Sequence, residues 1–363
     1  MVDRDNVKKL RWRKKRSRVP RITWFLTGIF IVILLFVFTP LPYYVTRPGS
    51  AVVLQPIIQV EGGVKDEKGS FMLTTVRMGE ANLFWYLYAK VSPDVDLLDK
   101  DLVVPPGETG EDFTQRELTV MKNSQQTAEA VAFKRAGYKV RTENTGVLVM
   151  GTIPNMPARG VLKIGDVITE ISGKKIRTVK ELLSLLDKKK AGEKVEVVFQ
   201  RDGKAMKTTL RLSALPDPDG GKSSRVGFGI RPENKQVIEV PKKVTIQSEK
   251  IGGPSAGLMF TLEIYDQLNK QIDLTRGYRV AGTGTIDTDG SVGRIGGINH
   301  KIIAADEAGA EIFFAPNDTE GDVSNFEEAA ATAKRIGSKM LVIPVNSVDD
   351  AITYLKSLQP KRS

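Results

Sequence analysis

The sequence of 363 residues contains no cysteine and only one histidine, His300. Without cysteine the fold cannot have disulfides, and the chain cannot use a cysteine nucleophile. One histidine cannot provide both ligands of a His-x-x-x-His zinc helix, and we expect no metal site. A Ser-His-Asp triad would have to use His300, but the sequence around it has no matching triad context. A nucleophile is therefore expected to work with a different base.

The sequence also lacks a convincing phosphate-binding loop. Gly221, Lys222 and Ser223 resemble the end of such a loop, but the motif needs a glycine five positions before Gly221, where Pro216 stands. No strand pattern precedes this segment, and no other Walker-type loop occurs in the sequence. We therefore expect no cofactor and no use of nucleotides.

Positive charge is concentrated near the N-terminus. The net charge is +11, but residues 1–21 hold ten Lys or Arg and two Asp, so about +8 of it lies there. A nucleic-acid-binding protein should carry its basic residues on a folded face rather than in a short tail. The charge distribution therefore argues against nucleic acid as a partner.

A long apolar run follows the basic tail. Ile22–Phe38 contains no charged residue, and with its flanks it reaches about 20 residues, enough for one membrane-spanning helix. Trp24 and the pair Tyr43–Tyr44 stand where interfacial aromatic residues belong. A cleaved signal peptide would have a shorter apolar core and a small-x-small site, which is not found around Pro40. The positive-inside rule predicts a cytoplasmic tail and places everything after Tyr43 outside the cell.

The rest of the chain divides by composition and by the spacing of its apolar residues. We expect an α/β (α+β) fold with an N-terminal transmembrane helix, a unit of short strands with one helix, and a C-terminal α/β unit. The expected regions are a basic tail (1–21), an anchor (22–42), a connecting α/β segment (43–125), the unit of short strands (126–214) and the α/β unit (225–360). A loop rich in proline, glycine and acidic residues is expected over Leu102–Glu117, and a helix over Gln125–Ala136.

The unit of short strands resembles a bacterial PDZ domain. A strand is expected from Gly146 to Ile153, and Gly165-Asp-Val-Ile168 is similar to the family's Gly-Asp-Val-Ile turn. A helix is expected over Val179–Lys189. The resemblance implies capture of a peptide by strand addition. It assigns the peptide-binding role to four residues: Gly146, Val147, Leu148 and Val149.

The candidate nucleophile is Ser255, within Ile251-Gly-Gly-Pro-Ser-Ala-Gly-Leu258. This serine stands where a glycine-rich turn enters an amphipathic helix, expected over Ser255–Asn269. Pro254 suits the first turn of a helix, because it has no N–H to leave unpaired. Three glycines keep side chains away from the serine: Gly252, Gly253 and Gly257. Free N–H groups at a helix N-terminus can bind an oxyanion, but the segment alone leaves open that Ser255 only caps the helix.

The candidate base is Lys301. A lysine can accept a proton from serine if it is neutral, and burial or a position at a helix N-terminus lowers its pKa. Lys301 follows Asn299, which suits a helix N-cap, in a helix expected over Asn299–Ala308. Without further information, an ordinary exposed lysine remains the alternative.

Two motifs resemble those of the Lon-type protease domain. Gly253-Pro-Ser-Ala-Gly257 is similar to its nucleophile motif, and Gly296-Gly-Ile-Asn-His-Lys301 is similar to its Gly-Gly-Leu-x-x-Lys motif. The resemblance implies a Ser255–Lys301 catalytic dyad, supported by Gly253, Pro254 and Thr283, with Thr283 orienting the lysine. One departure is Gly252, because Lon-type domains often carry an acid at this position.

The combination of anchor, PDZ domain and Lon-like domain resembles the membrane-anchored serine proteases of the YlbL/SepM type in Gram-positive bacteria. That resemblance implies an ATP-independent endopeptidase at the outer face of the cell membrane. Its expected substrates are secreted or cell-surface peptides and unfolded segments, because the chain has no ATPase module to unfold proteins. The alternative is a membrane-tethered, peptide-binding adaptor with an inactive protease-like domain.

Overall fold

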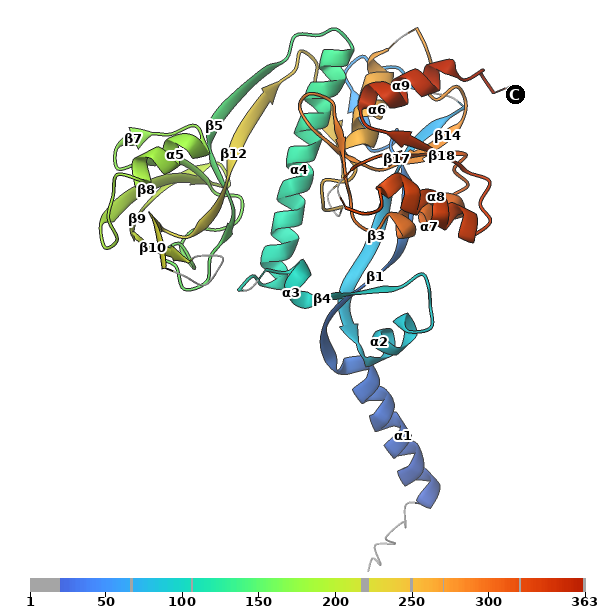
Figure 1. The fold of residues 1–363 in the computed structure, drawn as a ribbon, viewed down its shortest axis with the longest axis horizontal. Helices are drawn as coiled ribbons and strands as arrows, with labels where there is room; N and C mark the ends of the chain where they lie inside the picture. Colours follow the sequence, from blue (N-terminus) through green and yellow to red (C-terminus); the bar gives the residue numbers. More distant parts are fainter. Residues whose placement is uncertain are drawn as a thin grey trace, which may run out of the picture.

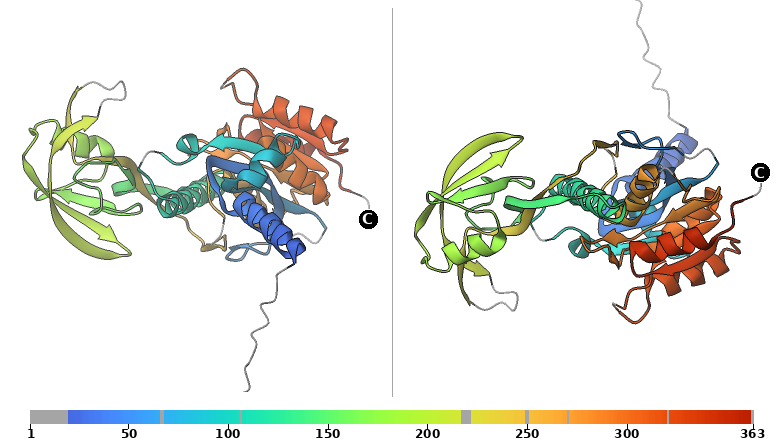
Figure 2. Two further views of the ribbon diagram at one scale, coloured as in Figure 1. Left: turned by 90° about the horizontal axis from the view of Figure 1, so that it is seen from below. Right: turned by 90° about the horizontal axis from the view of Figure 1, so that it is seen from above.

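The computed structural model describes residues 20–65, 68–105, 107–216, 222–248, 251–269, 271–319 and 321–361. The chain forms two folded units whose sheets lie on either side of the long helix α4 (Gly110–Arg135), and an isolated helix projects below them (Figure 1). We call them the small unit (residues 141–211 and 230–239) and the large unit (residues 40–136 and 244–358). The views from below and above show the same separation (Figure 2). The predicted fold class is confirmed.

A six-stranded sheet forms the centre of the large unit, in the order β18-β17-β14-β3-β1-β4. The strands on the C-terminal side are β14 (Arg279–Gly282), β17 (Ile312–Pro316) and β18 (Leu341–Val345), and they run parallel to one another. The other half consists of β1 (Pro40–Val53), β3 (Ser70–Asn82) and β4 (Asp96–Asp99). The segment expected to be a connection therefore supplies half of the central sheet.

The two faces of β3 pack against different helices because side chains alternate along a strand. Phe71 and Leu73 belong to the core shared with α4, α6 (Gly257–Leu268) and α9 (Val348–Ser357). Met72 belongs to the core on the other face, with α7 (Ile298–Glu307) and α8 (Asn325–Arg335). Every residue of α6 is buried, so this helix lies in the middle of the large unit.

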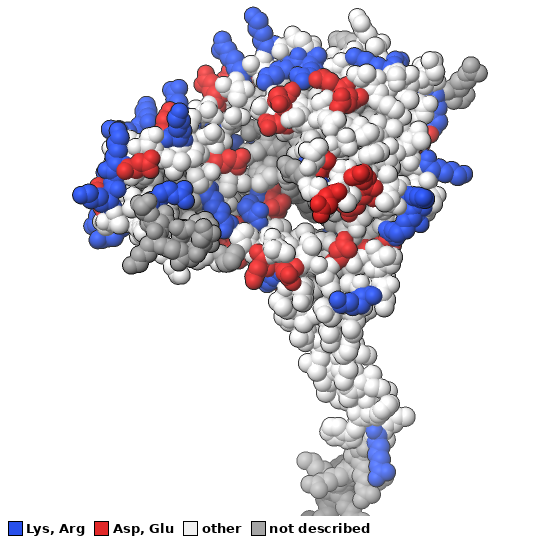
Figure 3. Space-filling model, viewed as in Figure 1, with Lys and Arg blue, Asp and Glu red and all other residues white. Residues whose placement is uncertain are grey.

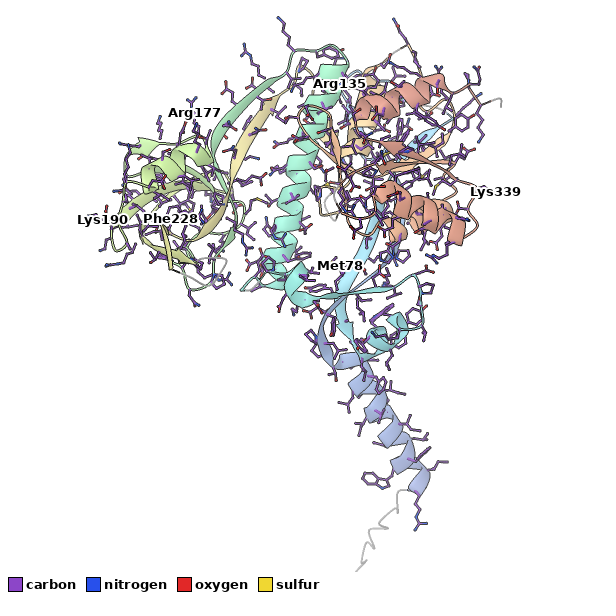
Figure 4. All side chains as sticks on the ribbon, viewed as in Figure 1. Met78, Arg135, Arg177, Lys190, Phe228 and Lys339 are labelled. Carbon is purple, nitrogen blue, oxygen red and sulfur yellow. The ribbon has the colours of Figure 1, made fainter. Side chains whose placement is uncertain are left out.

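Helix α4 is longer than predicted, since the sequence indicated a loop over residues 102–117 and a helix only from Gln125. Its start is fixed by a capping box. The Thr109 side chain accepts from the N–H of Asp112 at 3.0 Å, and the Asp112 carboxylate accepts from the N–H of Thr109 at 3.1 Å. At its other end Arg135 donates to the Asp349 carboxylate of α9 at 2.8 Å (Figure 4). Helix α4 is thus part of the large unit.

The small unit is a sheet in the order β12-β5-β6-β8-β9, covered by α5 (Val179–Leu186). Its strands are β5 (Arg141–Thr152), β6 (Val167–Ile171), β8 (Lys194–Arg201), β9 (Lys204–Arg211) and β12 (Ile230–Glu239). Strand β12 comes long after β5 in the sequence and pairs antiparallel with it. The small unit therefore does not end at residue 214 as expected. It also contains β12, which the sequence analysis assigned to the C-terminal α/β unit.

Short elements complete the described chain. They are β2 (Ile58–Val60), α2 (Leu83–Ala89), α3 (Lys100–Val103), β7 (Lys174–Lys175), β10 (Ser213–Pro216), β11 (Lys222–Gly227), β13 (Val244–Ile246), β15 (Thr285–Ile286) and β16 (Val292–Gly293). Strand β13 pairs with β2, β10 with β11, and β15 with β16.

Helix α1 (Arg21–Phe38) projects from the large unit with none of its residues buried. Its mean hydropathy is 2.3 over 18 residues. At about 1.5 Å per residue its length is about 27 Å, close to the thickness of a bilayer's hydrocarbon core. The helix is thus long and apolar enough to cross a membrane. It ends earlier than the expected anchor, because β1 begins at Pro40, and the basic tail up to residue 19 lies outside the described residues.

Candidate active site

Ser255 lies in the turn that precedes α6, at the centre of the large unit. The helix begins at Gly257 and its N-cap is Ala256, which makes no side-chain cap hydrogen bond. Helix α6 therefore starts two residues later than the sequence suggested, and Ser255 does not cap it. The serine side chain is free of a capping role and available for other contacts.

Helix α4 holds the turn before the serine. Gly253 has φ of +87°, a left-handed conformation that glycine adopts without strain, and its N–H donates to the Glu117 carbonyl at 3.0 Å. The Ser124 hydroxyl donates to the carbonyl of Pro254 at 3.0 Å. Gly253 and Pro254 therefore contribute through their backbone conformation, which hydrogen bonds to α4 hold in place.

Two other glycines allow backbone segments to approach this turn closely. A Cβ on Gly252 would lie 2.9 Å from the Cβ of Glu117. A Cβ on Gly257 would lie 2.6 Å from Cγ2 of Ile286. Both distances are shorter than real Cβ contacts, so glycine is needed at each position for α4 and β15 to pack here.

Lys301 projects from α7 into the same place. Its Nζ lies 2.8 Å from Ser255 Oγ, 3.1 Å from Thr283 Oγ1 and 3.2 Å from the carbonyl oxygen of Thr74. The side chain is buried, with 3% of the residue exposed. The candidate nucleophile, base and supporting threonine, separated along the sequence, thus meet within hydrogen-bond distance.

The hydrogen bonds around Nζ are compatible with a neutral amine whose lone pair faces the serine. The Thr74 carbonyl can only accept, and the Thr283 hydroxyl donates its own hydrogen to the Ser255 carbonyl at 2.9 Å, so it accepts from Lys301. A neutral amine has two hydrogens, and these two acceptors use both. Ser255 Oγ is the remaining partner, and it can donate its hydrogen to the lone pair.

Burial lowers the pKa of Lys301 to about 7. The physical cause is loss of hydration of the charged form, and not the N-cap arrangement expected from the sequence. Helix α7 begins at Ile298 after Gly297, whose φ of +67° is left-handed, so Asn299 lies inside the helix. The Asn299 side chain donates instead to the Asp96 carboxylate at 3.1 Å.

Thr74 was not anticipated as part of the site. It lies on β3, in the segment expected to be a connection, and it contributes a backbone carbonyl rather than a side chain. A carbonyl group carries no residue-type signature, so no sequence pattern could have indicated it. Thr283, by contrast, lies just after β14, and its hydroxyl reaches both Lys301 and Ser255.

His300 lies beside Lys301 but takes part in a different contact. Its Nε2 is 3.1 Å from the Asp96 carboxylate and 3.2 Å from Thr46 Oγ1, and Ser255 is not among its hydrogen-bond partners in the described chain. Burial lowers the pKa of His300, and the nearby Asp96 partly opposes this. The arrangement is not a Ser-His-Asp triad.

Hollows adjoin Ser255 on two sides. One has a volume of about 690 Å³ and reaches Lys301, the other about 280 Å³. Apolar side chains line much of the larger one: Val76, Met78, Leu98, Phe113, Leu118 and Ile295. Met78 lies on β3 (Figure 4). An extended polypeptide could therefore pass the serine with side chains on both sides.

Family models match both units of the chain. The model of the Lon protease C-terminal proteolytic domain matches residues 224–357, and the PDZ domain model matches residues 135–212. The chain contains a PDZ domain and a Lon-type proteolytic domain. Ser255, Thr283 and Lys301 lie within the Lon-type match, whereas the contacts from Thr74 and α4 come from outside it.

Several known proteins are similar to part of the chain. A Lon protease of Neorickettsia sennetsu is 31% identical over 34% of this chain, which corresponds to 13% of that protein. A DegP-like periplasmic serine endoprotease of Pseudomonas putida is 33% identical over 31% of this chain and 26% of that protein. The PDZ domain of an SdrC-like protein from Listeria monocytogenes is 32% identical over 24% of this chain and 87% of that structure, with a TM-score of 0.22. The matches thus cover 13% and 26% of these curated proteins' lengths.

The four residues expected to bind peptide in the PDZ domain lie on an interior strand of its sheet. Gly146–Val149 lies inside β5, which pairs with β12 on one edge and β6 on the other. Val147, Leu148 and Val149 are buried. An incoming peptide therefore finds no unpaired edge on this segment, and the assignment is corrected. Alternating apolar residues look alike in interior and edge strands, so the sequence pattern did not separate the two.

The edge strand of the PDZ sheet is β12, which pairs only with β5 among the described strands and lies beside α5. The Asn234 side chain on β12 accepts from the N–H of Val179 at the start of α5, at 2.8 Å. A glycine-containing segment, Gly227–Gly229, precedes the strand, and Gly229 has φ of +83°. The Gly227-Phe-Gly229 sequence directly before β12 is the signal that could have indicated this edge strand.

Proposed function

We propose that this protein is a membrane-anchored serine endopeptidase that needs no ATP and uses Ser255 and Lys301 as a catalytic dyad. The observation that carries the proposal is the 2.8 Å contact between Lys301 Nζ and Ser255 Oγ in a buried site. The two other partners of Nζ are acceptors, which leaves its lone pair for the serine proton.

In the proposed reaction, neutral Lys301 removes the proton of Ser255 Oγ as this oxygen attacks the scissile carbonyl carbon. The ammonium of Lys301 then gives the proton to the leaving amine as the peptide bond breaks. A water molecule, deprotonated by Lys301, attacks the acyl-enzyme, and the ammonium of Lys301 then gives this proton to Ser255 Oγ as the bond between Oγ and the acyl carbon breaks and the product leaves. Thr283 and the Thr74 carbonyl hold the amine in place throughout.

The oxyanion of the tetrahedral intermediate would be held by backbone N–H groups of the nucleophile turn. No acceptor is found for the N–H of Ser255 or Ala256 within the described part of the chain. Both precede the first turn of α6, where the helix dipole favours negative charge. These groups support stabilisation of charge that develops only during the reaction.

Substrates are proposed to be secreted or cell-surface peptides and unfolded segments. The 363 residues contain no Walker-type loop, so nothing in them couples ATP to unfolding. Helix α1 would anchor the chain, with the large unit outside the cell. The PDZ domain would capture a peptide by strand addition to β12, beside α5.

The decisive experiment uses the full chain in detergent, because truncation near residue 45 would remove buried Tyr44 from β1. Unfolded casein and a peptide mixture are incubated without nucleotide, and cleavage should be lost in Ser255→Ala. Lys301→Arg should also be inactive, since a guanidinium does not give up its proton at usable pH. Lys339→Arg, on the exposed surface, is the matched control and should remain active (Figure 4).

Two outcomes would contradict the proposal. An active Lys301→Arg variant would remove this lysine as the base. If the unchanged chain cleaves nothing but binds peptides through its PDZ domain, the protein is the tethered adaptor considered above. Digestion of a stably folded, unnicked protein would contradict the proposed substrate class alone.

A further inference from the structure

Helix α2 (Leu83–Ala89) exposes a stripe of apolar side chains to solvent. Its sequence, Leu-Phe-Trp-Tyr-Leu-Tyr-Ala, is apolar or aromatic throughout. One side packs on a small core through Trp85 and Ala89. The other side presents Phe84, Leu87 and Tyr88 at i, i+3 and i+4, with exposed fractions of 52%, 48% and 44%. Val91, 80% exposed, follows in the turn after the helix. Spacing at i, i+3 and i+4 normally marks the face of a helix that is buried against an apolar partner.

The position of α2 is tied to the end of α1. Asn82 donates through Nδ2 to the carbonyl of Val37 at 2.8 Å, and its Oδ1 accepts from the N–H of Trp85 at 3.0 Å. One side chain thus caps the C-terminus of α1 and the N-terminus of α2. Val37 is the penultimate residue of α1, so α2 begins at the level where the apolar helix ends (Figure 1).

The residues of α2 and its surroundings have the chemistry of a membrane–water interface. Tyr43 and Tyr86 are in ring contact at 5.6 Å. Arg47 lies 4.8 Å over the ring of Trp85, and Lys90 lies 5.2 Å over that of Tyr86. Aromatic rings and basic side chains with apolar stems are enriched at this depth. On the face shown in Figure 3, the surface directly above the projecting helix is mostly free of charged side chains.

We infer that α2 lies in the interface of the bilayer that α1 crosses, with its exposed stripe among the lipid headgroups and upper acyl chains. This rests on the proposed membrane anchor. If the 27 Å of α1 fill a hydrocarbon core of about 30 Å, the contact between Asn82 and Val37 places the start of α2 at the headgroup boundary. The partner is the lipid surface, because the stripe is continuous with the apolar surface of α1.

The contact of α2 with the lipid surface, in addition to that of α1, sets the distance between the active site and the membrane. Strand β3 runs from Asn82 back to Val76, which lines the hollow beside Ser255. Six residues of strand span about 20 Å. With both α1 and α2 held by lipid, the large unit cannot swing freely about the end of α1, and the catalytic hollow stays at about this height.

The absence of cysteine allows a direct test. Single-cysteine variants of the full chain carry a spin label in vesicles of phosphatidylcholine, with or without phosphatidylglycerol. Labels on F84C, L87C, Y88C and V91C should be several-fold more accessible to oxygen than to a water-soluble nickel chelate. Exposed apolar residues of the PDZ and Lon-type domains serve as matched controls, and L183C and L341C should show the reverse ratio.

A label on I29C in α1 separates this inference from the proposed anchor. If I29C is immersed but the α2 labels are as accessible to nickel as L183C, the inference is overturned and the anchor stands. If I29C is also accessible to nickel, both are overturned. Spin–spin broadening among α2 labels would show that a second copy covers the stripe, which also overturns it. Adding F84E should expel the Y88C label without affecting I29C.

Discussion

Among single residues, Lys301 is expected to control how activity depends on pH. Burial lowers its pKa to about 7, and only the neutral amine can accept the serine proton. We therefore expect kcat/KM to rise as pH increases through about 7 and to level off above it. The measurement is cleavage of one peptide at constant ionic strength across this range. A rise centred near pH 10 would contradict a depressed lysine pKa.

The same shift should appear in stability. An unfolded lysine titrates near 10.5 and the folded one near 7, so between these values the unfolded chain binds more protons and stability rises with pH. At pH 7 the difference destabilises the fold by about 4 kcal/mol. Lys301→Met lacks this dependence, so its stability relative to the unchanged chain should fall by about 3 kcal/mol between pH 7 and pH 10.

Paired denaturation curves of the two chains measure this difference. The loss of hydrogen bonds with the amine changes the difference in free energy of unfolding by the same amount at every pH. The way this difference varies with pH therefore tests the pKa of Lys301. Parallel curves for both chains at all pH values would contradict the assignment.

Thr283 is a positioning residue whose hydroxyl both donates and accepts. It donates to the Ser255 carbonyl at 2.9 Å and accepts from Lys301 at 3.1 Å. Thr283→Val keeps the shape and removes both bonds, and kcat should fall about 10- to 100-fold with little change in KM. Thr283→Ser keeps the hydroxyl and should retain most activity. Equal losses in both variants, with lowered melting temperatures, would indicate a packing role instead.

At the scale of elements, the contact between α6 and β15 depends on the missing side chain at Gly257. A methyl group there would lie 2.6 Å from Cγ2 and 2.9 Å from the backbone nitrogen of Ile286. Gly257→Ala should therefore cost about 1–3 kcal/mol and displace Ser255, two residues earlier. Gly110→Ala is the control, because nothing lies within 4 Å of its added methyl group. Thermal unfolding and cleavage rates measure both; unchanged values for Gly257→Ala would contradict this packing.

The sequence indicated candidate site residues where a short motif specifies the local backbone geometry. The glycine-rich turn at Ser255 and the Gly-Gly turn before Lys301 pointed to residues that lie 2.8 Å apart. Contacts made by the backbone carried no such signal, as with the Thr74 carbonyl and the Glu117 carbonyl that holds Gly253. Helix α4 was shortened in the prediction because polar residues fill its first turns, and the Thr109 capping box was not recognised there.

At the scale of the whole molecule, the PDZ domain interrupts the Lon-type unit. Residues 40–99 and 279–345 contribute strands to one sheet, and β3 pairs in parallel with β14 across some 200 residues. Sequence patterns along the chain could identify strands but not this pairing, because contacts so distant in sequence leave no local periodicity. The pairing of β12 with β5 could not be predicted for the same reason, because the other strands of the small unit lie between them in the sequence.

This discontinuity predicts that residues 224–361 cannot fold alone, although the Lon-type family match covers most of them. The rest of the chain supplies fully or almost fully buried core residues: Leu54, Phe71, Leu73, Met121, Val131 and Phe133. Without them β14 loses its neighbour β3, α6 loses α4, and Lys301 loses the Thr74 carbonyl. Exposure of so much apolar surface exceeds what a marginally stable domain tolerates.

We expect the 224–361 fragment to show no cooperative thermal transition and no reaction of Ser255 with a serine-directed probe, whereas residues 40–361 should show both in mild detergent. Adding residues 40–136 as a separate chain should restore probe labelling, since they carry β1, β3 and α4. A 224–361 fragment that unfolds cooperatively and labels at Ser255 would mean that the N-terminal strands are dispensable. Lys301 would then be less buried and its pKa less depressed, so the rise of activity with pH should shift to a higher pH than in the full chain.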